Sequence, residues 1–306
     1  MARKLNKTIL FALKVSVSSA LLYYVLAKTG IKQVASTLKT VNIYAFFSSV
    51  GIYIFTQIIS TMRWKLFLPE GFKTKKLFSL YMIGSFFNTF MPGVIGGDAV
   101  KAYYLYRETN MANISFGSIF MDRYLGFIGL LILCSIAFPF GLNYFHGSKT
   151  EWLLPFAIFI FFFASFLIFG LRLGQRIRFL AEFYNYFHTY RSQKNKIIKG
   201  LILSMIIQFF GVTSVSVLAY GLGENIPFLS FLIFVPLIIL FAMLPVSISG
   251  FGVREGAFVF FFGLIGVRSE TATALSLLWF LTMATAGIIG LIEYLKYKKE
   301  IITLKE

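Results

Sequence analysis

The sequence predicts an all-α polytopic membrane protein with six to eight transmembrane helices and one or two re-entrant hairpins broken by proline and glycine. Of its 306 residues, 58% are hydrophobic and only 13% are charged, and the mean hydropathy is +0.79. These values lie far from those of soluble domains. Several apolar runs approach the roughly 20 residues that a helix needs to cross a bilayer. We expect a single integral membrane domain over residues 1–306.

The distribution of basic residues indicates how the chain is oriented. The formal net charge is +17, and most Lys and Arg residues cluster in the two termini and in segments 63–76, 101–107 and 172–199. The candidate outer loops carry Lys28, Lys32, Lys39 and Lys149. This asymmetry follows the positive-inside rule, so we expect a multi-pass protein of a bacterial or archaeal inner membrane with both termini in the cytoplasm. The basic face would attract anionic lipid. Nucleic acid is not expected as a partner, because the basic segments adjoin the membrane.

The candidate full spans are the apolar runs 9–27, 41–62, 114–140, 152–171, 200–221 and 271–293. The first run continues past a small-residue Ser18-Ser19-Ala20 site and is expected to be uncleaved. Lys28 to Thr40 forms the first outer connection. Arg63-Trp64-Lys65 ends the second span and is interpreted as an interfacial anchor. The basic, aromatic stretch 172–199 has apolar residues at helical spacing and predicts a helix at the cytoplasmic surface.

Two glycine-rich, charged segments, 86–101 and 244–256, interrupt the apolar pattern. The apolar segment 77–91 before the first proline would rise only ~22 Å as a helix, short of the ~30 Å hydrocarbon core. We therefore expect 77–106 to enter and leave the membrane from the inside. For 228–267 the sequence leaves open either two short spans or a hairpin from the outside. The count is thus eight spans with one hairpin, or six spans with two opposed hairpins.

The two interruptions resemble each other. Each has a proline followed nine positions later by a cation, Pro92 before Lys101 and Pro245 before Arg254, with glycines between them and an acid nearby. If the hairpins enter from opposite faces, this pattern is that of an inverted repeat, which transporters use to place a site near the midplane.

The residue types at the interruptions suit the binding of a phosphate. Broken helices expose N–H groups that favour anions, and glycines let the backbone approach closely. Arg254 can donate two hydrogen bonds to a phosphate, while Lys101 or Arg123 adds positive charge and carboxylates balance the cations. The candidate substrate-binding set comprises the cations Lys101, Arg123 and Arg254, the acids Asp98, Asp122 and Glu255, the neutral Asn88 and Ser249, and the glycines Gly96, Gly97, Gly250 and Gly252.

A structural interpretation of the charged residues stands beside this one. Asp122-Arg123 and Arg254-Glu255 could each pair merely to pin helices together. Sequence neighbours on a helix do not face one another. Each member is therefore expected to find its partner elsewhere, which indicates one shared network.

These motifs resemble the membrane domain of lysylphosphatidylglycerol synthase/flippase proteins. The residues that carry the resemblance are Asn88…Pro92-Gly93…Gly96-Gly97-Asp98…Lys101, then Asp122-Arg123, then Leu244-Pro245…Gly250…Gly252-Val253-Arg254-Glu255-Gly256. It covers nearly the whole chain, including Arg63-Trp64, and Lys101 stands where that family often has Arg. The resemblance implies re-entrant helices that move lipids or lipid-linked headgroups between leaflets. Full-length members add an aminoacyl-transferase domain, which is not expected here, so synthesis of the lysyl lipid is not expected either.

The leading hypothesis is a lipid translocase rather than an enzyme, moving a membrane phospholipid or a prenyl-phosphate-linked lipid along a groove between the hairpins. Two alternatives stay open. One is an intramembrane transferase acting on a prenyl-phosphate lipid, with Asp98 or Asp122 as base or metal ligand; the other is a non-catalytic partner that docks a lipid-modifying enzyme through 172–199. No cofactor or metal is predicted, and no nucleotide-binding P-loop is present. A homo-oligomer and an enzyme partner are both left open.

Overall fold

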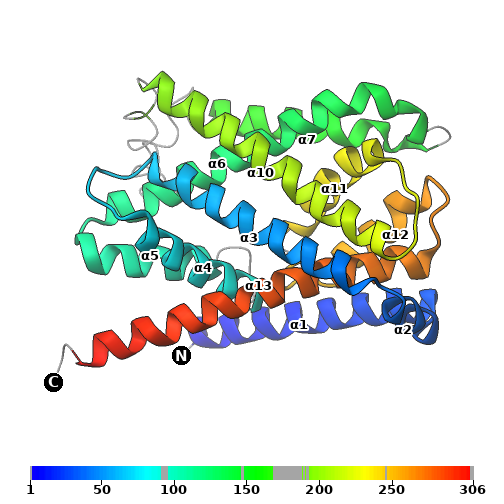
Figure 1. The fold of residues 1–306 in the computed structure, drawn as a ribbon, viewed down its shortest axis with the longest axis horizontal. Coiled ribbons are helices and arrows are strands. Elements are labelled where there is room, and N and C mark those ends of the chain that lie inside the picture. The colour runs from blue at the N-terminus through cyan, green and yellow to red at the C-terminus, as the bar shows by residue number, and fades with distance from the viewer. Residues whose placement is uncertain are drawn as a thin grey trace.

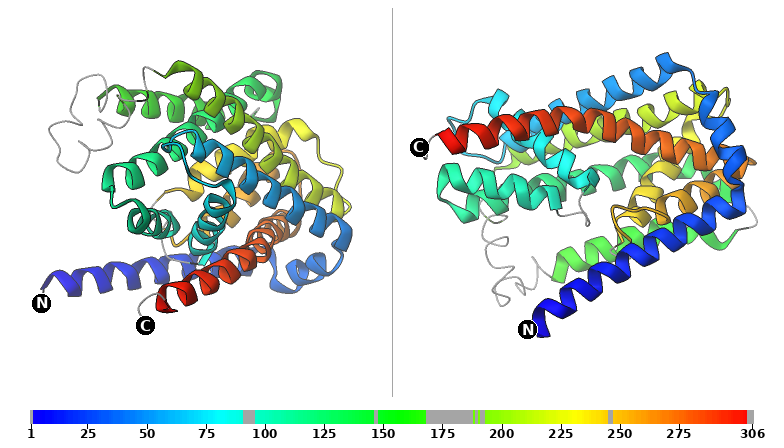
Figure 2. Two further views of the ribbon diagram at one scale, coloured as in Figure 1. Left: turned by 60° about the vertical axis from the view of Figure 1, so that its left-hand side comes forward. Right: turned by 90° about the horizontal axis from the view of Figure 1, so that it is seen from below.

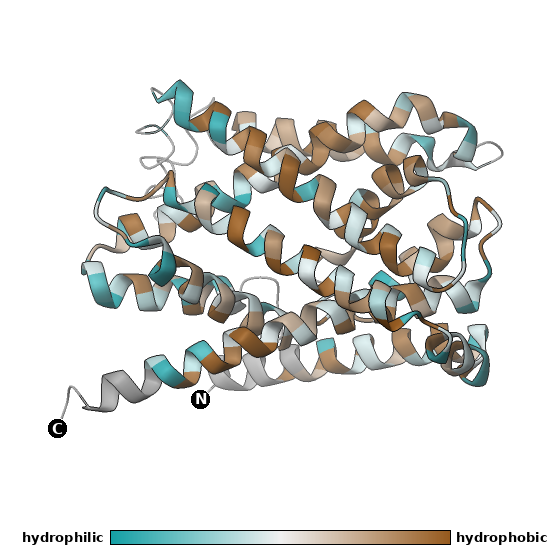
Figure 3. Ribbon diagram, viewed as in Figure 1, coloured by the Kyte–Doolittle hydropathy of each residue, from teal (hydrophilic) through white to brown (hydrophobic). Residues whose placement is uncertain are grey.

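The computed structural model describes residues 2–90, 96–145, 148–167, 188, 190, 193–244 and 247–303, with the backbone alone described at 2–8, 10, 11, 149 and 298–303. Every regular element in these ranges is helical, which confirms the predicted all-α class. The helices form an elongated bundle, and both chain ends lie at the same end of it (Figures 1 and 2). Hydrophilic residues gather mainly towards the two ends of the bundle (Figure 3).

Long helices run along the bundle and overlap five of the six predicted full spans. They are α1 (Ala2–Thr29), α3 (Ile43–Lys65), α6 (Ala112–Ala137), α10 (Lys194–Gly221) and α13 (Ser269–Thr303). Within the described residues, four helical segments are long and apolar enough to cross a membrane: Ile43–Lys65, Ala112–Phe145, Lys194–Gly221 and Ser269–Tyr297. The Phe-rich α7 (Leu153–Ser165) is shorter as described. These helices support a multi-pass membrane protein.

Short helices lie at the end of the bundle opposite the termini. The first connection is not a plain loop but contains α2 (Ile31–Lys39), and Asn42 then caps α3 by accepting hydrogen bonds from the next N–H groups. After α6 the chain continues as two 3₁₀ helices, η1 (Phe138–Phe145) and η2 (Lys149–Trp152). At the other end, residues from Lys194 onward already belong to α10. The rest of the surface helix predicted over 172–199 lies outside the described residues, apart from His188, Tyr190 and Gln193.

Two pairs of short antiparallel helices enter the bundle from opposite ends. α4 (Thr74–Phe90) and α5 (Gly96–Thr109) begin and finish at the end that holds the termini, whereas α11 (Phe228–Ala242) and α12 (Val253–Gly263) do so at the other end (Figure 1). α12 has 11 residues, a rise of about 16 Å, which is too short to cross a bilayer. Of the two arrangements that the sequence left open, the structure therefore shows two opposed hairpins. Their predicted breaking points at Pro92, Gly93 and Pro245 lie outside the described residues.

The helix order repeats with inverted direction. α3, α4, α5 and α6 form a long–short–short–long series, and α10, α11, α12 and α13 form a second series that runs the opposite way (Figure 1). The contacts correspond as well: α4 packs on α13 as α11 packs on α6, and α6 packs on α10 as α13 packs on α3. This is the arrangement of an inverted repeat.

Close helix crossings hold the bundle together. On α13, a Cβ at Gly290 would collide with the backbone carbonyl of Met82 on α4, so the glycine permits this approach. The central helices are also joined by hydroxyl groups, since Ser49 Oγ lies 2.7 Å from Ser214 Oγ and 3.3 Å from Thr282 Oγ1. The second hairpin is packed by fully buried phenylalanines from α11 and α12, namely Phe231, Phe234, Phe258, Phe261 and Phe262.

Candidate functional site

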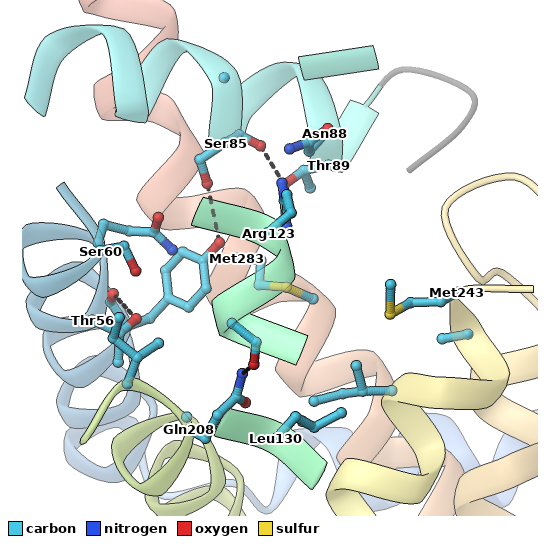
Figure 4. A pocket seen from close by; sticks show the side chains of 18 of the residues that line it. Thr56, Ser60, Ser85, Asn88, Thr89, Arg123, Leu130, Gln208, Met243 and Met283 are labelled. Atoms are coloured by element: carbon cyan, nitrogen blue, oxygen red, sulfur yellow. Dashed lines mark hydrogen bonds between the residues drawn. The ribbon is translucent and has the colours of Figure 1, made fainter. Parts of the chain in front are cut away.

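A cavity of about 410 Å³ lies where the inner ends of the two hairpins meet. The hairpins touch there, because the Ser249 hydroxyl lies 3.5 Å from the carbonyl oxygen of Asn88. α3, α6, α10 and α13 complete the wall. Thr56 and Ser60 lie on one side of the cavity and Met243 on the other (Figure 4). Residues from both halves of the inverted repeat thus line the space.

Charged side chains from three helices form one network beside the first hairpin. Asp122 on α6 is fully buried and accepts a hydrogen bond from Arg63 Nε at 2.8 Å, while Lys101 Nζ lies 3.8 Å from its other oxygen. Arg123 donates two hydrogen bonds to the carboxylate of Asp98, from Nε at 2.7 Å and from Nη2 at 3.1 Å. Lys101 Nζ also lies 3.7 Å from Asp98, which joins the two pairs. The expectation that Asp122 and Arg123 would find separate partners is confirmed. The expected single network is not seen, because among the described residues no hydrogen bond or salt bridge joins the ion pair of Arg254 and Glu255 to these side chains.

Aromatic rings complete the environment of Lys101. Its ammonium lies 4.6 Å from the centre of the Trp64 ring and 4.2 Å from that of Tyr81, distances typical of cation–π contacts. Trp64 Nε1 donates to Ser118, and the Tyr81 hydroxyl donates to Asp122 at 3.0 Å. The lysine side chain is therefore held in the wall of the cavity, 2% exposed.

The second hairpin carries a smaller cluster. Glu255, in the first turn of α12, accepts a hydrogen bond from the N–H of Gly252 at 2.6 Å, and its other oxygen receives Arg254 Nη2 at 2.7 Å. Ser276 on α13 bonds to both side chains. The prediction that Arg254 and Glu255 would have separate partners is wrong. Side chains on a helix turn back towards its N-terminus, and here Glu255 turns to cap α12 and brings its carboxylate to the guanidinium of Arg254.

The interpretation of Arg63-Trp64 as an interfacial anchor is also wrong. Both side chains are buried, with 5% of Arg63 and none of Trp64 exposed. Arg63 lines the cavity, bonds Asp122, and donates to Ser204 on α10 at 2.9 Å. Tyr81 is a second cavity residue that the sequence did not reveal. A signal for Arg63 exists on α3, where it continues a face of polar residues spaced by three and four positions.

The structure places the predicted site residues in three groups. Six of them line the cavity: Asn88, Asp98, Lys101, Arg123, Ser249 and Arg254. Asp122 and Glu255 lie behind this wall as fully buried partners of its cations. The four glycines shape the backbone instead: Gly96 begins α5, Gly97 packs against the carbonyl of Gly84, and Gly250 and Gly252 have positive φ angles of 78° and 81°. Within the described residues, no three His, Cys, Asp or Glu side chains group as metal ligands.

The cavity has a polar and an apolar side. Its charged groups, counted with their buried partners, are four cations and three carboxylates, which leaves one positive charge in excess: Arg63, Lys101, Arg123 and Arg254 against Asp98, Asp122 and Glu255. Neutral polar side chains of α3 and α4 adjoin them: Tyr53, Thr56, Gln57, Ser60, Ser85 and Thr89. The apolar side is formed by Leu130, Ile207, Val212, Ile239, Met243 and Met283, among others. An amphipathic ligand with an anionic polar end matches this lining.

Comparisons with known proteins agree with the fold and the motifs. The model of the family described as the lysylphosphatidylglycerol synthase TM region matches residues 11–290. A UPF0104 membrane protein of Methanocaldococcus jannaschii is 23% identical, over 90% of this chain and 92% of that protein. A UPF0104 membrane protein of Methanothermobacter thermautotrophicus is 24% identical, over 79% of this chain and 80% of that protein. The chain belongs to the lysylphosphatidylglycerol synthase TM region family.

Proposed function

We propose that this member of the lysylphosphatidylglycerol synthase TM region family is a lipid translocase, which moves a phosphate-containing lipid or lipid-linked headgroup between the leaflets of a bacterial or archaeal inner membrane. The observation that carries the proposal is the cavity between the hairpins, which joins a cationic side to an apolar side inside a bundle of membrane-spanning helices. A charged headgroup needs polar partners around it when it crosses the hydrocarbon core, because burial of an unpaired charge in lipid is costly.

Arg123 is the side chain best placed to receive the phosphate. Its Nε and Nη2 atoms bind Asp98, but 49% of the side chain is exposed and it lines the cavity. By contrast, Arg63 and Arg254 are 5% and 4% exposed and are committed to buried partners. A phosphodiester carries one negative charge, which the excess positive charge of the cavity would neutralise. Arginine is suited to this exchange because its planar fork can bind carboxylate or phosphate.

The apolar side offers a surface for the lipid tails. Leu130 of α6 and Met243 at the end of α11 face the cavity across from the polar residues of α3 (Figure 4). Met243 is 41% exposed, so the apolar surface continues outward at this point. The headgroup would occupy the polar side while the tails stay in contact with apolar side chains and lipid.

The opposed hairpins support movement between two faces. The α4–α5 hairpin enters from the end that holds the termini and the α11–α12 hairpin from the opposite end (Figure 1), and residues of both line the cavity. Inverted repeats permit an inward-open and an outward-open state that are built alike. The two states interconvert when one half moves against the other around a central site. Displacement of one hairpin at a time would then open the cavity to one leaflet at a time.

The test is leaflet-resolved transfer of fluorescent lipids in liposomes that contain the purified protein. Dithionite bleaches dye in the outer leaflet, so transfer appears as loss of fluorescence beyond that of protein-free liposomes. We expect transfer by the wild type and its loss in Arg123→Gln. Arg268→Gln is the matched control, because that arginine is 70% exposed at the opposite end from the termini and does not line the cavity. Absence of transfer by folded wild type for all phospholipids and prenyl-phosphate lipids tested would refute the proposal.

A further inference from the structure

We propose that Ser79, Glu108, Glu293 and Tyr297 form a latch that holds the first hairpin closed, and that release of this latch opens the cavity to the end of the bundle that holds the termini. The inference rests on the proposed function, because it names a contact that must break when the α4–α5 hairpin moves. It follows from the way in which α13 runs along α4 towards that end (Figure 1) and is joined to both arms of the hairpin.

The first contact of the latch lies where the hairpin begins and ends. Glu108, near the end of α5, is 2.9 Å from Lys76 Nζ in the first turn of α4, so an ion pair joins the two arms. The Tyr297 hydroxyl on α13 donates a hydrogen bond to the same carboxylate. The Tyr297 ring also packs edge-on against Tyr104 of α5, with ring centroids 5.0 Å apart. The open end of the hairpin is thus fastened both to itself and to α13.

The second contact of the latch lies one helical turn further into the bundle. Ser79 on α4 donates a hydrogen bond of 2.7 Å to the carboxylate of Glu293 on α13. The neighbouring Tyr294 packs edge-on against Phe87 of α4, with ring centroids 5.1 Å apart. Because Glu293 and Tyr297 are four positions apart, they lie on one face of α13. Their contacts show that this face is turned towards the first hairpin.

The latch crosses the seam between the two halves of the inverted repeat, which are α3 to α6 and α10 to α13. The charged network around Lys101 ties α5 to α3 and α6, which belong to the same half. Glu108 and Glu293 instead join the hairpin to α13 of the other half. The bond from Arg63 to Ser204 also crosses the seam, between α3 and α10. Movement of the halves can therefore leave the network around Lys101 intact, but the latch must separate when the hairpin leaves α13.

Deeper in the bundle, the contact between α4 and α13 has a different character. Gly290 of α13 lies against the backbone of Met82, and Gly287 lies against Phe86, so the helices meet there without polar side chains. In a membrane, lipid tails are as apolar as the side chains that they replace, so separation of such surfaces lacks the hydrophobic penalty that it has in water. A carboxylate that loses its hydrogen-bond donors is more costly. Glu108 and Glu293 are therefore the groups that resist separation.

The second hairpin meets the first half of the repeat through apolar side chains. α11 packs on α6, and Leu131, Cys134 and Ala137 of α6 join Ile233 and Phe234 of α11 in one apolar core. The two ends of the bundle are thus closed by different chemistry. Substitutions that weaken the latch should open the end that holds the termini and leave the opposite end closed.

The test measures access to a cysteine in the cavity, independently of lipid transfer. Ser60→Cys supplies the reporter, because Ser60 is buried in the cavity wall and cysteine is close to serine in size. The buried Cys134 is replaced by alanine. A membrane-impermeant thiol reagent is added to sealed vesicles of both orientations. A separate Lys65→Cys variant identifies the vesicles that expose the end with the termini, since Lys65 is exposed where α3 leads into the first hairpin.

The latch variant is Ser79→Ala/Tyr297→Phe, which removes the hydroxyl donors to both carboxylates and keeps the tyrosine ring. We expect the Ser60→Cys reporter to react about tenfold faster from the end that holds the termini, because two hydrogen bonds of the closed state are lost. Tyr297→Phe alone should give a smaller rise in the same direction. Thr271→Val is the matched control, since its hydroxyl donates to Glu224 at 3.1 Å at the opposite end; it should leave labelling from the end with the termini unchanged.

Two outcomes would overturn the inference: labelling of the latch variant at the rate of the wild type, or an equal rise from both ends, which indicates general loosening. Unfolding midpoints in SDS check that the variants are folded. Faster labelling of the latch variant from the end with the termini, together with a wild type that transfers no lipid, would refute the translocase and leave the latch standing. Lipid transfer by the wild type with no change in labelling of the latch variant would have the opposite meaning.

Discussion

Replacing Asp122 by Asn should destabilise the fold far more than replacing Asp98 by Asn, although both acids belong to the same network. Asp122 is fully buried, 2.8 Å from Arg63 and 3.8 Å from Lys101. At an effective dielectric constant of about 20, these pairs are worth about 6 and about 4 kcal/mol before desolvation is subtracted. Removing one member of a buried pair costs about 3–5 kcal/mol, because the remaining cations stay buried without their counter-charge.

Asp98 differs because its main partner faces the cavity. Arg123 is 49% exposed, so solvent screens the pair and it contributes about 1 kcal/mol or less. Unfolding of the purified variants by increasing SDS in mixed micelles, followed by tryptophan fluorescence, measures the difference. Trp64 is a suitable reporter, since it is fully buried and lies 4.6 Å from Lys101.

A double-mutant cycle tests the physical reason. In Arg63→Met/Asp122→Leu both charges are removed together, so no arginine is left unpaired. We expect this variant to lose less stability than the sum of the single variants, with a coupling energy of about 1–3 kcal/mol. Equal midpoints for Asp122→Asn and Asp98→Asn, or additive effects in the cycle, would show that Asp122 is not the counter-charge that holds the network.

Four further substitutions test packing and the cavity. Gly290→Ala should force α13 away from the carbonyl of Met82 and lower the unfolding midpoint, whereas Gly51→Ala, which meets nothing within 4 Å, should be neutral or stabilising by about 0.5–1 kcal/mol. Gly252→Ala should cost about 1–3 kcal/mol in the same SDS titration, because φ is +81° and the new Cβ would meet α1. Gly211→Leu should leave the midpoint near that of the wild type and abolish lipid binding in native mass spectra, because Gly211 lines the cavity beside open space. Unchanged lipid binding by a folded Gly211→Leu would place the lipid elsewhere.

The spans and hairpins could be predicted because membrane insertion depends on length and composition, which are local properties of the sequence. The run 77–91 was too short to cross, and the structure shows α4 turning back as α5. The second hairpin was ambiguous from sequence, since α11 is a continuous apolar helix of 15 residues with Pro236 inside it. Its length did not separate a short span from half of a hairpin. The structure decides the matter because α12 has only 11 residues and packs back against α11, a contact that the sequence does not show.

Pairing within the site was predictable only in part. The rule that neighbours on a helix point apart holds for Asp122 and Arg123, which lie in the middle of α6. It fails for Arg254 and Glu255, because these residues occupy the first turn of α12, where Glu255 turns back to the free N–H of Gly252. At a helix start the unpaired N–H groups attract an acid. The break before α12 made segment 244–256 recognisable in the sequence. The same break places Arg254 and Glu255 at a helix start, where the rule that sequence neighbours point apart does not hold.

The residues of α3 were missed for a different reason. In a soluble protein, polar residues spaced by three and four positions form a helix face that is exposed to water. Arg63 lies at a predicted membrane boundary, so the same exposure was expected for it. In a membrane the solvent outside is apolar, so the same face must turn inward, either to other helices or to a cavity. Thr56, Gln57 and Ser60 continue to Arg63 with this spacing, and all four are buried and line the cavity. The polar face of α3 therefore marks the wall of the cavity and not a boundary of the membrane.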